Sequence, residues 1–232
     1  MQSFRNAAKS GFDEGQFGEN KRTGFKHLIE LNSNTTKQEK VIIFSAPSGA
    51  GKTSIVRALL TKISSLAFSI SACSREPRPN ETHGKDYFFI PAQEFKNKIS
   101  SGDFLEWEEV YTNHFYGTLN SELSRIWSES KVVIFDVDVK GGINIKEKLG
   151  GDALSVFVMP PSIEELENRL RSRKTESEDK IQQRISKANE ELQDAKYFDF
   201  VLENDNLERA VEEAESIIKE ETEKQMIKNS YK

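Results

Sequence analysis

Three short apolar runs dominate the pattern of hydrophobic and polar positions along the chain: VIIF at 41–44, VVIF at 132–135 and ALSVFVMPP at 153–161. Each run has the length of a strand, and the segments between the runs carry apolar residues at helical spacing. Strands that are apolar along their whole length are buried on both faces, as in a parallel sheet covered by helices on both sides. The pattern therefore predicts an α/β fold built on such a sheet.

Helical spacing is clearest after the first run and in the last third of the chain. TSIVRALLTKI at 53–63 predicts a helix, and 162–198 predicts a heavily charged helical segment that breaks near 172–177. A last strand is expected at 198–205, and an amphipathic closing helix is expected at 206–225.

The segment 71–118 has a different character. DYFFI at 86–90 predicts an aromatic strand, and a helix is expected near 91–100. FLEWEEVYTNHFYGT at 104–118 alternates apolar and acidic residues around a turn, which predicts two strands joined by that turn. We interpret the segment as an inserted lobe that contains antiparallel strands.

Composition excludes several classes of protein. The net charge is −5, from 33 basic and 38 acidic residues, so the chain lacks the basic field of a nucleic-acid-binding protein. One cysteine, Cys73, excludes an internal disulfide framework. No apolar run approaches the ~18 residues of a membrane span. We therefore expect a cytoplasmic protein that binds neither nucleic acid nor membrane, as a monomer or a homodimer.

The 232 residues allow one domain of ordinary size with an inserted lobe. Residues 1–38 show no sustained period and are expected to be a flexible N-terminal extension. The main domain is expected at 39–220, and a C-terminal tail is expected at 221–232.

SAPSGAGKTS at 45–54 predicts a phosphate-binding loop, because it stands between a buried strand and a helix. Lys52 would reach the β- and γ-phosphates, and the Thr53 hydroxyl suits a Mg²⁺ ligand. Ala46 stands where the usual pattern has glycine, which is tolerable if the backbone there is ordinary. A chance G-x-G-K turn is the alternative, which the flanking strand and helix disfavour. The predicted ATP-binding loop residues are Ala46, Pro47, Ser48, Gly49, Ala50, Gly51, Lys52, Thr53 and Ser54.

KVVIFDVDVKGG at 131–142 is interpreted as one buried strand that ends in acids and glycines. Asp136 at its end is a candidate for orienting Mg²⁺, since a carboxylate at this edge of a sheet would lie beside the phosphate loop. The alternative is an acid that only caps the strand.

SACSREPRP at 71–79 places Arg75 and Arg78 three residues apart beside prolines. Two guanidinium groups on a rigid turn suit a phosphate monoester, whereas two solvated loop arginines are the alternative. The N-K-x-D element of a GTPase is absent from the sequence.

In order and spacing, seven segments of the chain resemble guanylate kinases. They are APSGAGKT, S-x-x-S-R-x-P-R-P, GKDYFF, FLEW, YGT, FDVDVKGG and RLRSRKTESEDKIQQR, and they run from about 40 to 220. The resemblance implies a P-loop kinase that transfers a phosphoryl group from ATP to GMP with Mg²⁺. It also implies a GMP-binding lobe at about 71–120 and a lid at about 165–190. The chain departs from the family at Cys73 and Ser74, where two threonines are usual, and in the turn 111–115, which is one residue longer.

The resemblance also implies roles position by position. The residues that would hold the GMP phosphate are Ser71, Arg75, Arg78, Tyr87 and Tyr116. Those that would read guanine are Glu106, Thr118 at its O6, and Asp138 near its amino group. Those that would clamp the ATP phosphates are Arg169, Arg173 and Arg184, and Asn204 would touch adenine.

Elementary chemistry supports part of this assignment. Guanine presents N1–H and N2–H₂ side by side, and the Glu106 carboxylate could accept both, whereas adenine has no N1–H. As one acid among several, Glu106 could instead lie on a solvated strand face. The acceptor phosphate is already anionic, so no general base is needed, and Lys52, Mg²⁺, Arg173 and Arg184 would balance the transferred charge. The charged segment at 171–179 is expected to close over the site and exclude water.

Two other functions stay open on the sequence. One is a non-catalytic module of the same family that binds peptides, although this chain keeps Lys52, Thr53, Arg173 and Arg184. The other is a P-loop kinase with a different acceptor, such as AMP, UMP or a non-nucleotide.

Overall fold

The computed structural model describes residues 40–172 and 177–230. The chain divides into two units, Met1–Lys37 and Gln38–Lys232, and all described residues belong to the second. The expected N-terminal extension at 1–38 and the candidate Arg173 lie outside the described residues.

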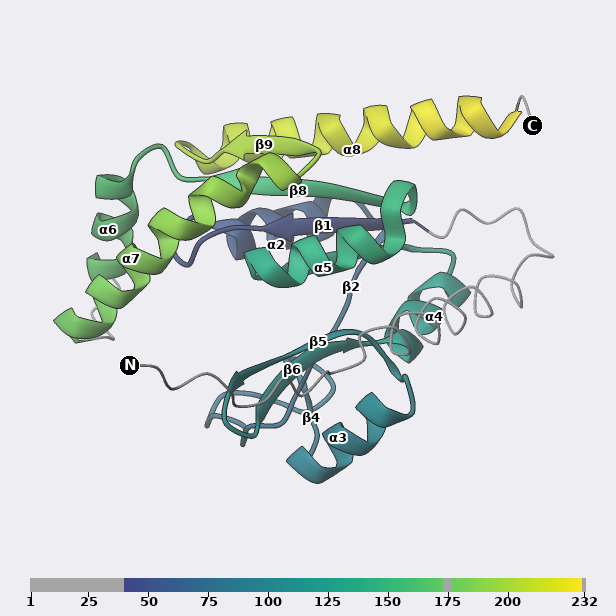
Figure 1. Cartoon of the computed structure of the whole chain (residues 1–232). Helices are drawn as coiled ribbons and strands as arrows, with labels where there is room; N and C mark the ends of the chain where they lie inside the picture. The colour runs from purple at the N-terminus through teal and green to yellow at the C-terminus, as the bar shows by residue number, and fades with distance from the viewer. Residues whose placement is uncertain (1–39, 173–176, 231–232) are drawn as a thin grey trace, which may run out of the picture. The chain divides into compact units, whose positions relative to one another are not determined.

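The second unit is built on a central sheet of five parallel strands (Figure 1). In spatial order the strands are β2 (Leu66–Phe68), β7 (Val132–Val137), β1 (Val41–Ser45), β8 (Ala153–Met159) and β9 (Phe200–Glu203). All four neighbouring pairs are parallel, and β1 lies in the middle. The three apolar runs are therefore the three central strands, and the predicted fold class is confirmed.

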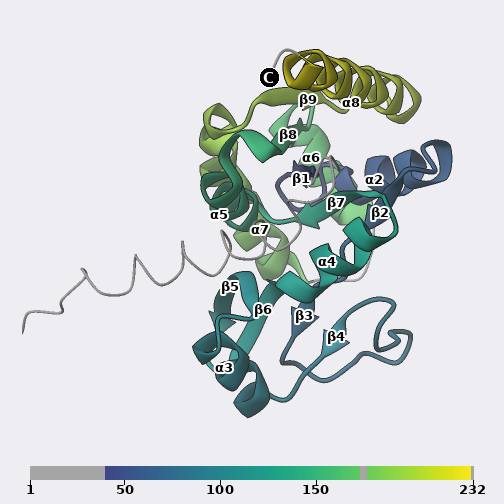
Figure 2. The same cartoon turned by 90° about the vertical axis from the view of Figure 1, so that its right-hand side faces the viewer.

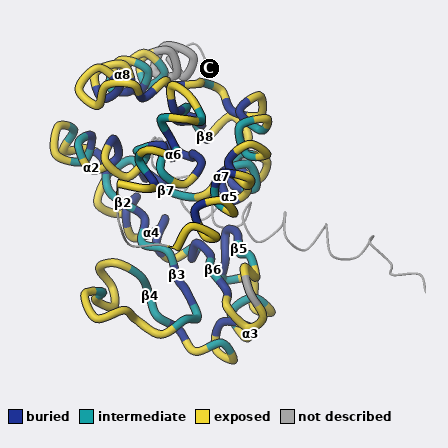
Figure 3. The backbone as a smooth tube through the Cα atoms, turned by 90° about the vertical axis from the view of Figure 1, so that its left-hand side faces the viewer, coloured by how far each residue is buried: buried dark blue, intermediate teal, exposed yellow. Residues whose placement is uncertain are grey.

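Helices cover both faces of this sheet (Figure 2). On one face, α2 (Lys52–Lys62) and α8 (Leu207–Ser230) pack over Val156 and Val158 of β8. On the other face, Phe157 of the same strand packs against Val139 of α5 (Val139–Leu149). Burial is concentrated on the strands, and the outer turns of the helices are exposed (Figure 3).

The charged helical segment forms two separate helices, α6 (Ile163–Ser172) and α7 (Glu178–Gln193), as expected. Residues 173–176 between them lie outside the described residues. Short 3₁₀ turns follow α5 and α7, at η1 (Gly150–Asp152) and η2 (Asp194–Tyr197). The boundary expected at 220 falls inside α8, which continues to Ser230. No glycine or proline interrupts the sequence between 207 and 230, and the helix therefore continues past the point where its apolar period weakens.

The strand expected at 131–142 is wrong in its second half. β7 ends at Val137, Asp138 caps the next helix, and α5 begins at Val139. Gly141 and Gly142 disfavour a helix by propensity. The packing requires one of them, because a Cβ built on Gly142 would lie 2.1 Å from Ser45 Oγ of β1.

A second sheet forms the inserted lobe, with the order β4 (Phe88–Phe89), β3 (Ala72–Cys73), β6 (His114–Leu119) and β5 (Phe104–Tyr111). The β3–β6 and β5–β6 pairs are antiparallel, as expected, whereas β3 and β4 pair in parallel. α3 (Ala92–Ser100) packs on this sheet, and α4 (Asn120–Ser128) leads back to the central one. In the lobe's core, Phe95 stacks on Phe104 and Phe115 with ring centroids 4.3 and 5.5 Å apart.

Within the described residues, no helix is long and apolar enough to cross a membrane.

Candidate active site

The loop between β1 and α2 has the backbone that phosphate binding requires. Gly49 and Gly51 have φ angles of +99° and +95°, a region that glycine alone adopts readily. Among the described residues, the only non-glycine residues with positive φ are Asn113 and Ser130, so the backbone at Ala46 is ordinary. The departure from glycine at Ala46 therefore introduces no strain.

Asn204 supports this loop from behind. Its side-chain Nδ2 donates a hydrogen bond of 2.7 Å to the carbonyl oxygen of Ala50, and the residue is only 5% exposed. A Cβ built on Gly51 would lie 2.1 Å from the same nitrogen. The structure thus places Asn204 and Ala50 under the loop, because Asn204 directly follows the end of β9, and neither residue lines the cavity beside the loop.

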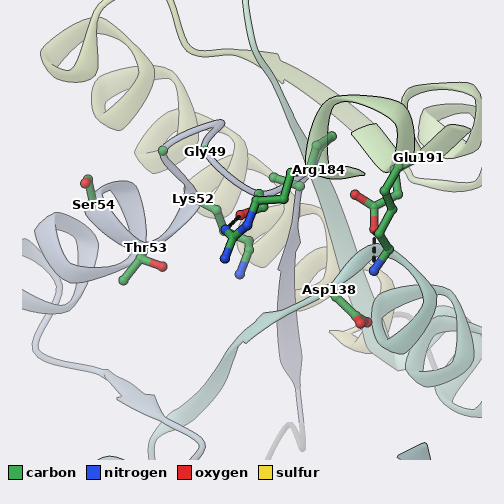
Figure 4. Close-up of a pocket in the computed structure, with 12 residues that line it drawn as sticks. Gly49, Lys52, Thr53, Ser54, Asp138, Arg184 and Glu191 are labelled. Atoms are coloured by element: carbon green, nitrogen blue, oxygen red, sulfur yellow. Dashed lines mark hydrogen bonds and ion pairs between the residues drawn. The ribbon is translucent and has the colours of Figure 1, made fainter. Parts of the chain in front are cut away.

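The loop borders a cavity of about 320 Å³, which we call the donor cavity (Figure 4). All predicted loop residues except Ala50 line it. Arg184 reaches it from α7, and its Nη1 donates a hydrogen bond of 2.5 Å to Ser48 Oγ. The cavity is completed by Asp138, Lys187 and Glu191.

Lys52 opens α2 and forms an ion pair with Asp136 at the end of β7. Both side chains are largely buried, with 15% and 12% of their surface exposed. Burial lowers the pKa of Lys52, while Asp138 and Glu191 raise it. The contact with Asp136 further favours the charged ammonium.

Arg169 does not line the donor cavity. Its Nε bonds Glu165 Oε1 at 2.9 Å, and its Nη2 bonds the carbonyl oxygen of Asn204 at 3.0 Å. It therefore braces the residue that supports the loop.

Two residues of the donor cavity were not predicted from the sequence. Lys187 and Glu191 follow Arg184 on α7 by three and seven residues and form an ion pair of 3.2 Å. Residues at this spacing share one face of a helix, so the position of Arg184 could have indicated both.

A second cavity of about 240 Å³, the acceptor cavity, lies between β5, β6 and the start of α5. It brings together five residues of the predicted acceptor set, namely Ser71, Tyr87, Glu106, Tyr116 and Asp138. Glu108 and Asp136 also line it.

Glu106 is 7% exposed, which excludes the solvated strand face. Thr118 Oγ1 donates a hydrogen bond of 2.9 Å to its Oε1. Burial raises the pKa of Glu106 to about 7, and Asp138 acts in the same direction, against the hydrogen bond from Thr118 and the charge of Lys148.

Arg75 is held beside the acceptor cavity. Its Nε donates to Tyr116 Oη at 3.1 Å, and its carbon Cζ lies 5.1 Å from the centroid of the Tyr87 ring. Its two terminal nitrogens bond both carboxylate oxygens of Glu81, at 2.6 and 2.7 Å. Glu81 was not predicted; the bonds from Arg75 lower its pKa to about 2.

Arg78 is not brought into the acceptor cavity. Its side chain is exposed, and its backbone N–H donates to Glu81 Oε2 at 2.8 Å. The turn between the two arginines therefore presents one guanidinium towards the cavity and the other towards solvent.

The two cavities share Asp138, which caps α5 by accepting a 2.8 Å hydrogen bond from the backbone N–H of Gly141. Lys52 lines one cavity, and its partner Asp136 lines the other. Both sites lie at the carboxyl ends of β1 and β7, where open parallel sheets bind their ligands. A cavity bordered by the glycine-rich loop thus adjoins a cavity with a buried carboxylate.

Comparison with known proteins agrees with this arrangement. A model of the family described as guanylate kinase matches residues 38–221. The chain belongs to the guanylate kinase family. It is therefore a kinase of the phosphotransferase class, as the sequence predicted.

Named guanylate kinases are similar to most of the chain. The guanylate kinase of Bacteroides fragilis is 51% identical over 185 residues, which cover 80% of this chain and 91% of the relative. That of Porphyromonas gingivalis is 48% identical over 180 residues, or 77% and 96%. The crystal structure of guanylate kinase from Anaplasma phagocytophilum matches with a TM-score of 0.63 at 26% identity, over 80% of this chain and 87% of that one.

Proposed function

We propose that the protein transfers the γ-phosphoryl group of ATP to GMP, giving ADP and GDP, and accepts dGMP in place of GMP. The observation that carries the proposal is the junction of the two cavities at Asp138, with buried Glu106 in one and Lys52 in the other. This reaction would serve purine nucleotide metabolism in the cytoplasm, in a monomer or a homodimer.

In the donor cavity, the glycine-rich turn and the first turn of α2 supply N–H groups to the phosphates of ATP. Lys52 and Arg184 bring positive charge to the same place. Arg173 is proposed as a further clamp on these phosphates. Asn204 and Arg169 act from behind as positioning residues.

Magnesium fits the oxygen groups present. Mg²⁺ in kinases takes one or two protein ligands and completes its shell with substrate phosphates and water. Thr53, in the donor cavity, and Asp136, beside Lys52, would hold the ion. Bound there, it would neutralise charge on the phosphates.

In the acceptor cavity, the Glu106 carboxylate accepts N1–H and N2–H₂ of guanine, with Thr118 facing O6 and Asp138 near the amino group. Tyr87, Tyr116 and Arg75 hold the phosphate, assisted by Ser71 and Arg78. An oxygen of this phosphate is the nucleophile and already carries charge, so the protein needs to position it and not to deprotonate it. Lys52 balances the charge that moves between the cavities.

The segment from α6 to α7 is proposed to act as the lid. It spans the expected range of 165–190, and α7 already touches the phosphate loop through Arg184 and Ser48. Closure of this segment would exclude water, which otherwise competes with GMP for the phosphoryl group.

The test is a coupled assay of ADP formation with ATP and each of GMP, dGMP, AMP, UMP and CMP. We expect turnover with GMP and dGMP and at least ~10³-fold less with AMP, since adenine leaves Glu106 unpaired. Lys52→Ala should lose about 10²–10³-fold in kcat. Lys62→Ala, at the exposed end of the same helix, is the control and should retain its rate. Equal rates with AMP and GMP, or near-normal turnover by Lys52→Ala, would overturn the proposal.

A further inference from the structure

Glu108 lines the acceptor cavity, although neither the motifs nor the proposed reaction give it a role. It lies two residues after Glu106 on β5, and successive side chains of a strand point to opposite faces, so both glutamates face the cavity. The pairing between them is regular: Glu106 lies opposite Thr118, and Glu108 lies opposite Tyr116. Glu108 is thus displaced by about 7 Å along the strand from the proposed guanine-reading group.

The direction of that displacement is towards the phosphate. Tyr116, opposite Glu108, accepts a hydrogen bond at its hydroxyl from Arg75, the guanidinium proposed to hold the phosphate. Glu106, which accepts the hydrogen bond of fully buried Thr118, lines the end of the cavity where the base is proposed to bind. In a nucleoside monophosphate the ribose joins the base to the phosphate, so Glu108 lies alongside the ribose. This step rests on the proposed function.

A carboxylate so near an anionic phosphate needs compensation, which Lys140 provides. Lys140 projects from α5, and its Nζ forms an ion pair with Glu108 Oε1. Within the described residues, Oε2 of Glu108 accepts no hydrogen bond, and 26% of the side chain is exposed. An ionised carboxylate only accepts hydrogen bonds, so its ligand must be a donor. The donors that a nucleotide presents at this level are the hydroxyl groups of its ribose.

We propose that Glu108, oriented by Lys140, accepts a hydrogen bond from a ribose hydroxyl and makes the enzyme favour ribonucleotide over deoxyribonucleotide acceptors. Glu108 is the specificity-determining residue, and Lys140 is a positioning residue. dGMP remains a substrate, because the base and phosphate contacts are unchanged.

The experiment compares kcat/KM for GMP, 2′-deoxy-GMP and 3′-deoxy-GMP at saturating ATP in the full chain. We expect wild type to favour GMP over at least one deoxynucleotide by about 10-fold, the magnitude of one charge-assisted hydrogen bond. Glu108→Ala should reduce that ratio to near 1, chiefly by lowering kcat/KM for GMP. Lys140→Met should reduce the ratio in part, and Lys140→Arg should restore it.

The matched control is Glu109→Ala. Glu109 carries the same charge on the same strand, is exposed, and bonds the backbone N–H of Asn113 outside the cavity. It should leave all ratios as in wild type. Thermal melting of each variant shows whether it folds.

Three outcomes would overturn the inference. They are equal kcat/KM for all three substrates in wild type, unchanged ratios in Glu108→Ala, and an equal change of ratio in Glu109→Ala. The absence of GMP turnover in wild type would instead contradict the proposed function.

Discussion

In the proposed reaction, Glu106 would couple recognition of GMP to pH, because only its ionised form can accept both N–H groups of guanine. Burial raises its pKa to about 7 in the free enzyme, so below pH 7 the site holds mostly the neutral acid. Protonation and GMP binding then compete. The KM for GMP should therefore be constant above about pH 8 and rise by up to ~10-fold per pH unit below 7.

The measurement is the KM for GMP between pH 5.5 and 8.5 at saturating ATP, with the KM for ATP as the internal reference. Glu106→Gln is the matched variant: it keeps an acceptor for Thr118 and loses the ionisation. Its KM for GMP should be high and independent of pH across this range. A wild-type KM for GMP that does not change between pH 6 and 8 would contradict the role of Glu106.

The contact between Glu106 and Thr118 was predictable because two nearby motifs supply its two sides. Glu106 and Thr118 come from FLEW and YGT, which pair directly across β5 and β6. The hydrogen bond of Asn204 to the carbonyl oxygen of Ala50 was not predictable, because the two residues lie 154 positions apart in sequence. Glu81 was not predicted, because its hydrogen bond to Arg75 depends on the fold of an irregular turn. Such a turn has no hydrophobic periodicity from which its fold could be predicted.

At the scale of elements, the contact of α5 with β1 positions Asp138 at the junction of the cavities. Ser45 Oγ donates a 3.2 Å hydrogen bond to the carbonyl oxygen of Asp138, and a Cβ on Gly142 would lie 2.1 Å from that Oγ. Gly142→Ala should therefore lower the free energy of unfolding by about 1–3 kcal/mol through overpacking. This loss would appear although alanine is the better helix former by about 1 kcal/mol.

Chemical denaturation of Gly142→Ala, Ser45→Gly and the double variant checks this contact. The double-mutant cycle should show a favourable coupling of about 0.5–3 kcal/mol, since Ser45→Gly removes the atoms that collide. Gly151→Ala, where a Cβ would meet nothing within 4 Å, is the control and should be close to wild type. A stabilised Gly142→Ala would show that propensity outweighs packing here.

The sequence predicted those elements whose packing leaves a local pattern of apolar residues. The three central strands were predictable because burial on both faces leaves an unbroken apolar run. The helix α5 was not predicted, because Gly142 is required for close packing against β1, and local helix propensity does not record that packing. The parallel pairing of β3 with β4 was also missed, because each strand has only two residues.

At the scale of the whole molecule, chain order and spatial order diverge. The sequence predicted a parallel sheet but not the order β2-β7-β1-β8-β9, which alone brings Lys52 and Asp136, 84 residues apart in sequence, into contact. The order matters for function, because neighbouring β1 and β7 end beside each other and thereby place the two cavities together.

The folding unit is expected to begin at about residue 38. The family match begins at residue 38, and the described fold begins at Lys40, whose Nζ bonds the carbonyl oxygen of Glu221 on α8 at 3.4 Å. A chain of residues 38–232 should therefore keep its melting temperature within about 2 °C of the full chain. Its kcat/KM for GMP should also stay within about 2-fold, a ΔΔG‡ below ~0.5 kcal/mol.

We expect the opposite result for the matched truncation at the C-terminus, a chain of residues 1–220. It removes Glu221 and the last turns of α8, which the sequence had assigned to a tail. The truncation keeps the core residues of α8, which end at Ile218, but removes the carbonyl oxygen that accepts the Lys40 hydrogen bond and shortens the helix. This chain should therefore melt several degrees lower, corresponding to about 1 kcal/mol or more. Calorimetry and the coupled assay on the three chains decide between the boundaries. Both expectations would be contradicted if the chain without residues 1–37 did not fold and the chain without residues 221–232 kept its melting temperature.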